Sequence, residues 1–300
     1  MSNFSRTFVV IFFVGRIFVY GEFVKTTIVI VSYNSFSVIE NCLGPLIDAG
    51  VCPVIVVDNA SQDGTAKRVS RRFPNASLIV LNHNVGYGRA ANYGFGKVKT
   101  DYVLLLNPDM MVSVESFLAI QSRLESLPEN VALLAPAVRK KDYIRKGVHD
   151  RDWVVGAAML FRVSAIREVG GFDENIFLFS EESDLCLRLR QAGKRICLDT
   201  DVFMEHLSKQ SSTPSPDVDF VKYWHFGWSN QYFVSKHGLA RGKKNPYRVL
   251  LLYFVKSIFA VRFKKRMEYW AKFSGARAFL KGTPAFDETG EAQQAYRLKR

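Results

Sequence analysis

Four short apolar runs constrain the fold of this chain more than any other feature. They lie at 26–31, 53–57, 77–81 and 102–106, and segments with a helical spacing of apolar residues separate them. Unbroken aliphatic runs of this length are typical of strands that are buried on both faces. Strands that alternate with helices predict an α/β fold, with a mostly parallel sheet flanked by helices.

Polar clusters follow three of these runs, at 32–34, 58–64 and 107–109. Ligands of such sheets bind beyond the carboxyl ends of the strands, so the three clusters predict a ligand site. Asp58 is placed to accept a hydrogen bond from a nucleobase or a ribose hydroxyl. Asp63 is better explained as a turn residue near the positive end of a helix.

The glycine-rich segment at 84–94 (NVGYGRAANYG) predicts a site for an anionic group. Gly86 and Gly88 allow the backbone to approach a ligand closely, and a helix that begins near Gly88 offers N–H groups beside Arg89. Asn92 lies one turn further on the same side of that helix. A diphosphate fits this arrangement, although an ordinary glycine-rich helix start is the simpler alternative.

Three further side chains predict a metal site. Asp109 follows the fourth strand beside the predicted diphosphate site, where a carboxylate suits Mg²⁺ or Mn²⁺. Asn107 offers a carbonyl oxygen to the ion or to a sugar, and His206 offers an imidazole. On its own, the tripeptide at 107–109 would be better explained as an Asn-Pro turn.

An acidic helix start predicts a general base. Glu181, Glu182 and Asp184 lie in the first turn of a helix expected over about 181–192, where the helix dipole alone favours acids. Asp184 is expected to pair with Arg188 one turn further on. Glu182 is expected to point toward the aromatic loop before the helix, where partial burial would raise its pKa into the range of a general base.

Positive charge is concentrated in the last third of the chain. The net charge is +13, and residues 241–281 contain 12 Lys or Arg against one acid. The segment 249–263 is apolar, but it is shorter than the ~20 residues of a membrane span. We expect a basic amphipathic helix on an anionic membrane surface, with a basic helical cap packed on the core as the alternative. Nucleic-acid binding is disfavoured, because aliphatic residues separate the basic ones and no recognition motif is present.

These patterns divide the chain into three parts. Residues 1–24 form an apolar N-terminal extension, whose apolar stretches are too short for a membrane span and are followed by no signal-peptide cleavage site. Residues 25–212 form the α/β domain, and residues 213–300 form a helical, basic region next to a Ser/Pro-rich linker. The four cysteines form no CxxC pair, which argues against a zinc site.

In their order along the chain, these segments resemble the inverting family 2 glycosyltransferases with the GT-A fold, in particular bacterial rhamnosyltransferases of O-antigen and cell-wall polysaccharide assembly. The resemblance covers about 25–212. It implies metal-dependent transfer of a sugar from a nucleoside-diphosphate sugar, with dTDP-rhamnose as one candidate, to a saccharide acceptor by a single displacement. The segments that carry it are VSYN at 31–34, VVDNASQDGT at 56–65, NVGYGRAANYG at 84–94, LLNPDM at 105–110, GAAMLFR at 156–162, GGFDENIFLFSEESDLCLRLRQAG at 170–193, and His206.

The resemblance also assigns roles to single residues. Asp109 takes the place of the family's metal motif, which is Asn-Pro-Asp in this chain, and His206 assists it. Glu182 takes the position of the base, with Glu181 in reserve, because Glu-Glu replaces the usual Glu-Asp. The nucleotide sugar would contact Val31, Tyr33, Asp58, Gly86, Arg89, Asn92 and Asn107, and the acceptor cleft would be shaped by Trp153, Phe172 and Asp173.

A lipid-linked acceptor would explain the basic C-terminal region. It would place the enzyme in the cytoplasm, peripheral on the inner face of the cell membrane. A sugar nucleotidyltransferase is a second hypothesis, but the loop at 32–35 lacks the glycine-rich, basic sequence that such an enzyme needs. A catalytically degenerate membrane-surface binding protein is a third, suggested by the Asn-Pro-Asp and Glu-Glu departures. The sugar, the nucleotide and the acceptor stay open.

Overall fold

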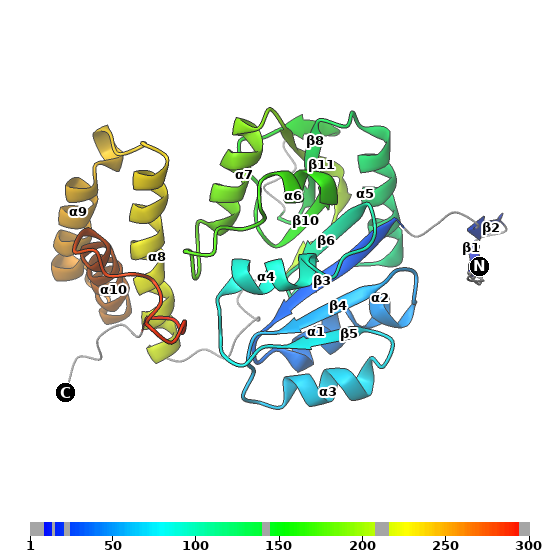
Figure 1. The fold of residues 1–300 in the computed structure, drawn as a ribbon, viewed down its shortest axis with the longest axis horizontal. Coiled ribbons are helices and arrows are strands. Elements are labelled where there is room, and N and C mark those ends of the chain that lie inside the picture. The colour runs from blue at the N-terminus through cyan, green and yellow to red at the C-terminus, as the bar shows by residue number, and fades with distance from the viewer. Residues whose placement is uncertain (1–8, 14–15, 21–24, 140–144, 208–215, 294–300) are drawn as a thin grey trace.

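A single large sheet flanked by helices dominates the molecule, and a unit of helices lies beside it (Figure 1). The computed structural model describes residues 9–13, 16–20, 25–139, 145–207 and 216–293. The expected linker at 208–216 lies almost entirely outside the described residues.

The sheet has eight strands in the order β5-β4-β3-β6-β10-β8-β11-β9. Two of them, β9 and β10, run against the other six, so the predicted mostly parallel sheet is confirmed. The strands are β3 (Thr26–Ser32), β4 (Val54–Asp58), β5 (Ser77–Val80), β6 (Tyr102–Leu106), β8 (Val131–Ala137), β9 (Val148–Asp150), β10 (Ala158–Arg162) and β11 (Arg195–Phe203).

Helices cover both faces of this sheet, which is why the apolar runs of the sequence are unbroken. Ile28 and Ile30 of β3 point into one core cluster, and Val29 and Val31 point into the other. The first cluster includes residues of the first, second, third and fifth helices, and the second includes residues of the fourth, sixth and seventh. These helices are α1 (Phe36–Cys42), α2 (Gly44–Asp48), α3 (Thr65–Arg72), α4 (Tyr87–Phe95), α5 (Val114–Ser126), α6 (Val163–Glu168) and α7 (Glu181–Gln191).

A small two-stranded ribbon brings distant parts of the chain together beside the sheet. It consists of β7 (Met110–Met111) and β12 (Glu205–His206), which run antiparallel. His206 pairs with Met110 in this ribbon. It therefore lies next to Asp109, which is the last residue of the loop after β6. The pairing therefore joins the two predicted metal ligands, although 97 positions separate them.

The C-terminal helices pack tightly against one another. They are α8 (Pro216–Lys236), α9 (Pro246–Phe259) and α10 (Phe263–Leu280), with a 3₁₀ turn, η2 (Gly242–Lys244), before α9. A Cβ atom at Gly227 would strike the backbone of Lys272, and one at Gly275 would strike the backbone of Trp224. The two glycines therefore let α8 and α10 meet backbone to backbone.

The C-terminal helices also contact the sheet domain. Phe177, in the loop before α7, packs into a third core cluster with Trp224 and Trp228 of α8 and with Phe286 beyond α10. Residues on both sides of the boundary expected near residue 212 therefore pack into one shared core cluster. Near the N-terminus, β1 (Val9–Phe13) and β2 (Arg16–Tyr20) form an antiparallel hairpin that lies apart from the sheet in Figure 1.

Candidate active site

A strained turn positions the acidic residues at the start of α7. Phe179 and Ser180 both adopt left-handed backbone conformations, with φ of 66° and 67°, which side chains with a Cβ atom rarely occupy. Strain of this kind concentrates at functional sites. The turn ends at Glu181, so the first two residues of the helix are Glu181 and Glu182.

Glu181 and Glu182 lie in different surroundings. Glu181 is buried, and its Oε2 atom has no hydrogen-bond partner among the described residues. Burial raises the pKa of Glu181 well above its usual value, and the neighbouring charge of Glu182 raises it further. Glu182 is half-buried; burial raises its pKa too, although the N–H groups of Glu182 and Ser183 oppose the shift.

Tyr87 connects the predicted base to the predicted metal site. Its hydroxyl donates a hydrogen bond to the carbonyl of Gly156 at 3.3 Å. Burial raises the pKa of Tyr87, and the negative charges of Glu181, Glu182 and Asp109 raise it further. These three carboxyl groups are therefore within electrostatic reach of one phenol. The sequence analysis did not single out Tyr87, although it lies between the two glycines of the 84–94 segment.

Asp109 and His206 form a buried pair. The Nε2 atom of His206 lies 3.1 Å from Oδ1 of Asp109, and the backbone N–H of Leu207 donates to the Asp109 carbonyl at 3.1 Å. A carboxylate and an imidazole can hold Mg²⁺ or Mn²⁺ when phosphate oxygens and water complete the coordination. Among the described residues, no group of three or more His, Cys, Asp and Glu side chains could hold a metal ion. An ion at this pair would therefore depend on ligands from the substrate.

The loops after β4 and β5 interlock at the same edge of the sheet. Asp58 is buried and accepts hydrogen bonds from the N–H and hydroxyl of Ser61 at 3.1 and 2.5 Å. Burial raises its pKa, and the bonds from Ser61 oppose that shift. The Asn59 amide ties this loop to Asn84 and Val85 at 2.9 Å each.

Gly86 begins the predicted anion site under tight constraint. Its φ of 86° is left-handed, and a Cβ atom there would strike the carbonyl of Phe177. Only glycine fits without strain.

Among the other expected donor contacts, Val31 is a buried core residue, whereas Tyr33 and Asn107 are half-buried. Of the residues expected at the acceptor cleft, Trp153 is 52% exposed.

Two side chains expected at the ligand have structural partners instead. The Asn92 amide donates to the carbonyl of Phe172 and accepts from its N–H, both at 2.9 Å. The ring of Phe172 is buried and stacks on Phe95. Their expected contacts with the donor and the acceptor stay predictions, and in this structure Asn92 and Phe172 contact each other. Both bind the loop before α7 to α4.

Arg89 also differs from its expected role. Its guanidinium donates to the carbonyl of Glu174 at 2.5 Å and lies 3.7 Å from the ring centre of Phe286. Arg89 therefore contacts the segment after α10 in this structure, and its positive charge faces an aromatic ring.

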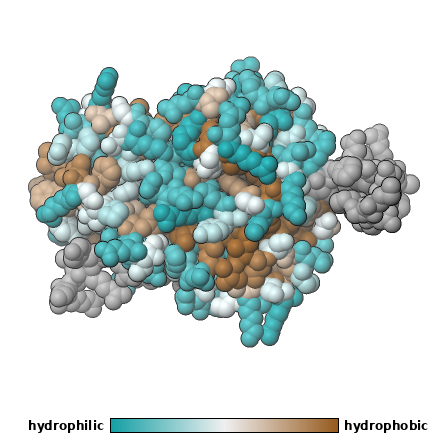
Figure 2. Space-filling view, in the orientation of Figure 1, coloured by the Kyte–Doolittle hydropathy of each residue, from teal (hydrophilic) through white to brown (hydrophobic). Residues whose placement is uncertain are grey.

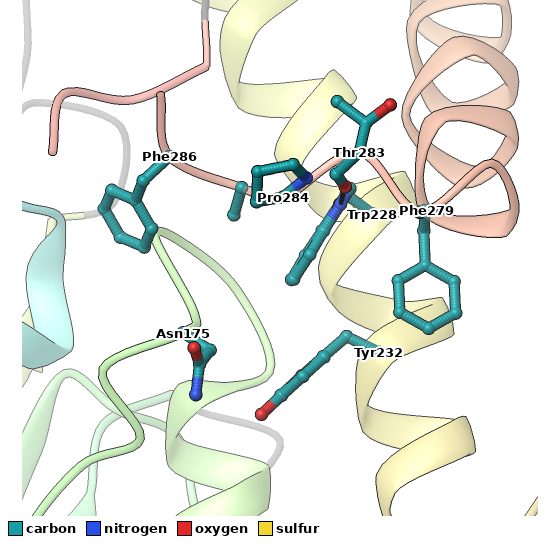
Figure 3. A pocket seen from close by; sticks show the side chains of 9 residues that line it. Asn175, Trp228, Tyr232, Phe279, Thr283, Pro284 and Phe286 are labelled. Carbon is teal, nitrogen blue, oxygen red and sulfur yellow. Dashed lines mark hydrogen bonds between the residues drawn. The ribbon is translucent and has the colours of Figure 1, made fainter. Parts of the chain in front are cut away.

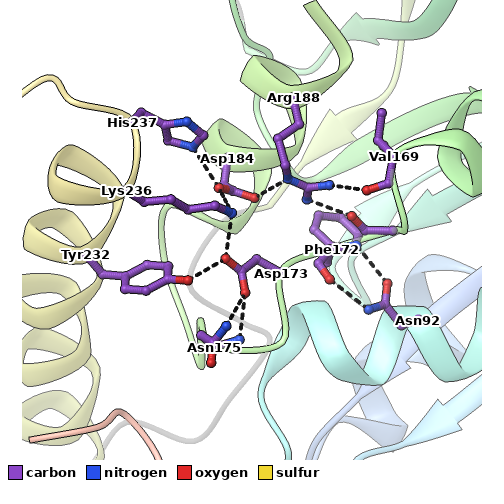
Figure 4. Close-up of polar contacts among 11 residues, drawn as sticks. Asn92, Val169, Phe172, Asp173, Asn175, Asp184, Arg188, Tyr232, Lys236 and His237 are labelled. Atoms are coloured by element: carbon purple, nitrogen blue, oxygen red, sulfur yellow. Dashed lines mark hydrogen bonds and ion pairs between the residues drawn. The ribbon is translucent and has the colours of Figure 1, made fainter. Parts of the chain in front are cut away.

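Asp173 points toward the C-terminal helices (Figure 4), and its assignment to the acceptor cleft stays a prediction. Its carboxylate accepts hydrogen bonds from the Tyr232 hydroxyl at 2.8 Å and from Lys236 at 2.6 Å. Burial opposes ionisation, but the hydrogen bonds from Lys236, Asn175 and Tyr232 outweigh it and lower the pKa of Asp173 to about 2.

Asp184 shares Lys236 with Asp173. The fully buried carboxylate of Asp184 contacts Arg188 at 2.7 Å, Lys236 at 2.6 Å and His237 at 2.8 Å (Figure 4). The predicted pair between Asp184 and Arg188 is confirmed. Because the helix that carries Asp184 begins with the two glutamates, this network connects α8 to the candidate base.

Replacing Asp184 by Asn should lower the free energy of unfolding by about 1.5–3 kcal/mol, because buried hydrogen bonds to charged groups are of that strength. The substitution would leave Arg188 and Lys236 near a neutral amide. Urea unfolding measures the change. The matched control is Asp152→Asn, since the ion pair of Asp152 with Arg190 is exposed and should contribute little. Equal midpoints for the two variants would contradict the importance of the network.

A cavity of about 230 Å³ lies beside Asn175 and Tyr232, which are hydrogen-bond partners of Asp173 (Figure 3). Trp228 and Tyr232 of α8 line one side of it, and the segment after α10 lines the other. Trp228 is stacked on Tyr232 and donates to the Thr283 carbonyl at 2.7 Å. Four of the nine lining residues are aromatic, and neither Glu181 nor Glu182 is among the nine.

Comparisons with known proteins agree with this geometry. Residues 27–184 match the family model described as glycosyl transferase family 2. An N-acetylglucosaminyl-diphospho-decaprenol L-rhamnosyltransferase of Mycobacterium tuberculosis is 30% identical, over 55% of this chain and 70% of the relative. The rhamnosyltransferase WbbL of Escherichia coli is 29% identical, over 56% of this chain and 78% of the relative.

Solved structures share the fold. The mannosyltransferase PcManGT of Pyrobaculum calidifontis, solved with GDP-Man and Mn²⁺, has a TM-score of 0.56 at 18% identity, over 86% of this chain and 74% of that one. TarS of S. aureus, residues 1–349, has a TM-score of 0.54 at 14% identity, over 86% of this chain and 92% of that one. At these identities the likeness concerns the fold alone.

Proposed function

The chain belongs to glycosyl transferase family 2, and from this premise we propose that it transfers a sugar from a nucleoside-diphosphate sugar to a saccharide acceptor in cell-surface polysaccharide synthesis. The observation that carries the proposal is the pairing of Asp109 with His206 at 3.1 Å, together with Glu181 and Glu182 at the start of α7, since all three carboxyl groups are within electrostatic reach of Tyr87. A base and a metal-binding carboxylate are the two groups that such a displacement needs.

Glu182 is the general base of this proposal. It keeps part of its surface exposed, and burial raises its pKa, which makes its carboxylate a stronger base. Its carboxylate takes the proton of the acceptor hydroxyl while the hydroxyl oxygen attacks the anomeric carbon. The bond from that carbon to the diphosphate oxygen breaks in the same step, so the configuration inverts. Glu181 lies beside it, and burial together with the charge of Glu182 raises its pKa and favours its uncharged form.

Asp109 and His206 are the metal ligands of this proposal. Their oxygen and nitrogen donors lie together in a buried position and fit Mg²⁺ or Mn²⁺. A bound divalent ion neutralises the charge that develops on the leaving diphosphate. Asn107, which directly follows β6, is proposed to contact the sugar or the ion.

The donor nucleotide is proposed to lie at the edge formed by the loops after β3, β4 and β5. Asp58 suits a hydrogen bond to the ribose or the base, with Val31 and Tyr33 beside it. Gly86 allows close approach of the diphosphate to the backbone. The exposed ring of Trp153 suits the acceptor sugar.

The finer identity of the substrates rests on the relatives. Two of them are rhamnosyltransferases, and the name of one includes a diphospho-decaprenol acceptor. We therefore propose dTDP-rhamnose as the first donor to test and a lipid-linked saccharide as the acceptor. Such an acceptor would hold the enzyme at the cytoplasmic, inner face of the cell membrane. Among the described residues, no helix is long and apolar enough to cross a bilayer.

A screen of nucleotide sugars tests the proposed activity. The purified chain is incubated with dTDP-, UDP- and GDP-sugars and a lipid-linked saccharide, with Mg²⁺, Mn²⁺ or EDTA. We expect nucleoside diphosphate release with one donor, in the presence of metal only. A sugar nucleotidyltransferase would instead release pyrophosphate from a nucleoside triphosphate and a sugar phosphate. Binding of no nucleotide sugar by calorimetry would contradict the proposal and favour a degenerate binding protein.

A further inference from the structure

The helix α9 leaves an apolar face uncovered. Its inner side, which includes Tyr253 and the buried Ser257, packs toward α10. Its outer side and the turn after it expose large apolar side chains, visible at the far end of the molecule from the sheet in Figure 2. We call these residues the α9 surface: Leu251, Val255, Ile258, Phe259, Val261 and Phe263.

The α9 surface is more apolar than scattered exposure would explain. Phe259 and Phe263 are each 76% exposed, and Val261 is 99% exposed. Of the 14 exposed large apolar residues in the described parts of the chain, nine lie between 247 and 263. Single exposed apolar residues need no explanation, but a contiguous patch marks a contact surface.

Basic residues surround the α9 surface. Lys244 and Arg248 precede it, and Arg262 and Arg266 flank its other end. Residues 241–281 contain one acid, Glu268, and it is buried and bonded to two lysines at 2.7 Å. No acidic group of this segment therefore offsets the positive rim. Anionic lipid complements such a surface, whereas a second copy of the chain would bring like charges together.

The length of α9 limits how it can meet a membrane. Its 14 residues span about 21 Å at 1.5 Å each, less than the ~30 Å of a hydrocarbon core. A short helix with an apolar face and basic ends lies in the plane of the interface. We propose that the α9 surface inserts among the headgroups of an anionic bilayer. This rests on the proposed function, whose lipid-linked acceptor it would bring within reach of the site.

Vesicle binding tests this inference. The full chain is sedimented with vesicles of phosphatidylcholine alone or mixed with phosphatidylglycerol. We expect binding to the anionic vesicles only, weakened by salt. Leu251→Glu with Ile258→Glu should weaken it at least about tenfold by opposing insertion. Arg262→Glu with Arg266→Glu should do the same by removing attraction of about 1 kcal/mol per basic residue.

A matched double variant distinguishes the effect of charge near the α9 surface on vesicle binding from the effect of net charge. Lys67→Glu with Arg71→Glu changes the net charge equally on exposed positions of α3, and should leave vesicle binding unchanged. Thermal unfolding confirms that every variant is folded. Equal binding to neutral vesicles, equal loss in the α3 variant, or no binding at all would overturn the inference. So would a dimer in lipid-free solution that Leu251→Glu with Ile258→Glu dissociates, since a second copy would then cover the surface.

The two proposals fail in different ways. If the chain transfers sugar to a water-soluble acceptor but does not bind vesicles, the inference that the α9 surface inserts into a bilayer is wrong, and the proposed function stands. If the chain binds vesicles but uses no nucleotide sugar, membrane binding by the α9 surface stands, and the proposed glycosyl transfer is wrong.

Discussion

Replacing Glu182 by Gln is expected to lower kcat by about 10²–10⁴-fold, which is the usual contribution of a general base. Gln keeps the shape and volume of the side chain, but its amide cannot take the proton of the acceptor hydroxyl. The KM for the nucleotide sugar should change little, because the proposed donor contacts lie at Asp58 and Gly86. The initial rate of nucleoside diphosphate release at saturating donor and acceptor measures the effect.

The pH dependence of that rate adds a second measurement. Burial raises the pKa of Glu182 above its usual value of about 4.5. A base acts only when ionised, so the rate should fall as the pH falls through the raised pKa. The acid limb of the profile should therefore lie at higher pH than for an ordinary glutamate. The residual activity of Glu182→Gln should lack this limb.

Glu181→Gln is the matched control for this substitution. Burial and the charge of Glu182 both favour the uncharged form of Glu181, so an amide of equal size should replace it with a smaller loss. A fully active Glu182→Gln variant beside an inactive Glu181→Gln variant would reverse the two roles. Full activity in both would contradict the assignment of either as base.

Replacing Asp109 by Ala is expected to lower kcat/KM by about 10²–10⁴-fold. A metal ion contributes several kcal/mol to stabilising charge on a leaving group, and each 1.4 kcal/mol is tenfold. The substitution removes the carboxylate and leaves only the imidazole of His206 from the pair. Calorimetric titration with nucleoside diphosphate should also lose its dependence on Mn²⁺, which is a readout independent of turnover.

Two further variants distinguish the loss of a metal ligand from misfolding. Asp109→Asn keeps the buried volume and should show the same loss of Mn²⁺ dependence with near-normal thermal unfolding. Asp101→Ala changes an exposed acid just before the same strand, β6, and should leave both readouts unchanged. Retention of Mn²⁺-dependent binding in a folded Asp109→Asn variant would rule out this carboxylate as a metal ligand.

The central sheet could be predicted from the sequence because its strands are locally distinctive. Ile28 and Val29 point to opposite faces, and both faces are covered, so the run around them has no polar interruption. The strand β8 (Val131–Ala137) was not predicted. It contains Pro136, which argues against a central strand. Its place between β10 and β11 depends on pairing with residues more than 20 positions away.

In the candidate site, too, some features follow from the local sequence and others depend on contacts with distant residues. Asp109 and Glu182 are predicted from local structural signals, the end of a strand and the start of a helix, and their roles stay predictions. The partners of Arg89 and Asn92 could not be predicted, because Glu174 and Phe172 lie 80 or more positions away. A helix position predicts the direction of a side chain, but only tertiary contacts decide what it meets.

The sharing of Lys236 between Asp173 and Asp184 has a consequence for protein engineering. A chimera that grafts the sheet domain onto foreign C-terminal helices would remove Lys236 and His237 from two carboxylates that the fold has already shielded from water. Arg188 alone would remain beside Asp184. Recombination would therefore have to carry these two residues across the splice point, so the C-terminal helices cannot be exchanged as an independent unit.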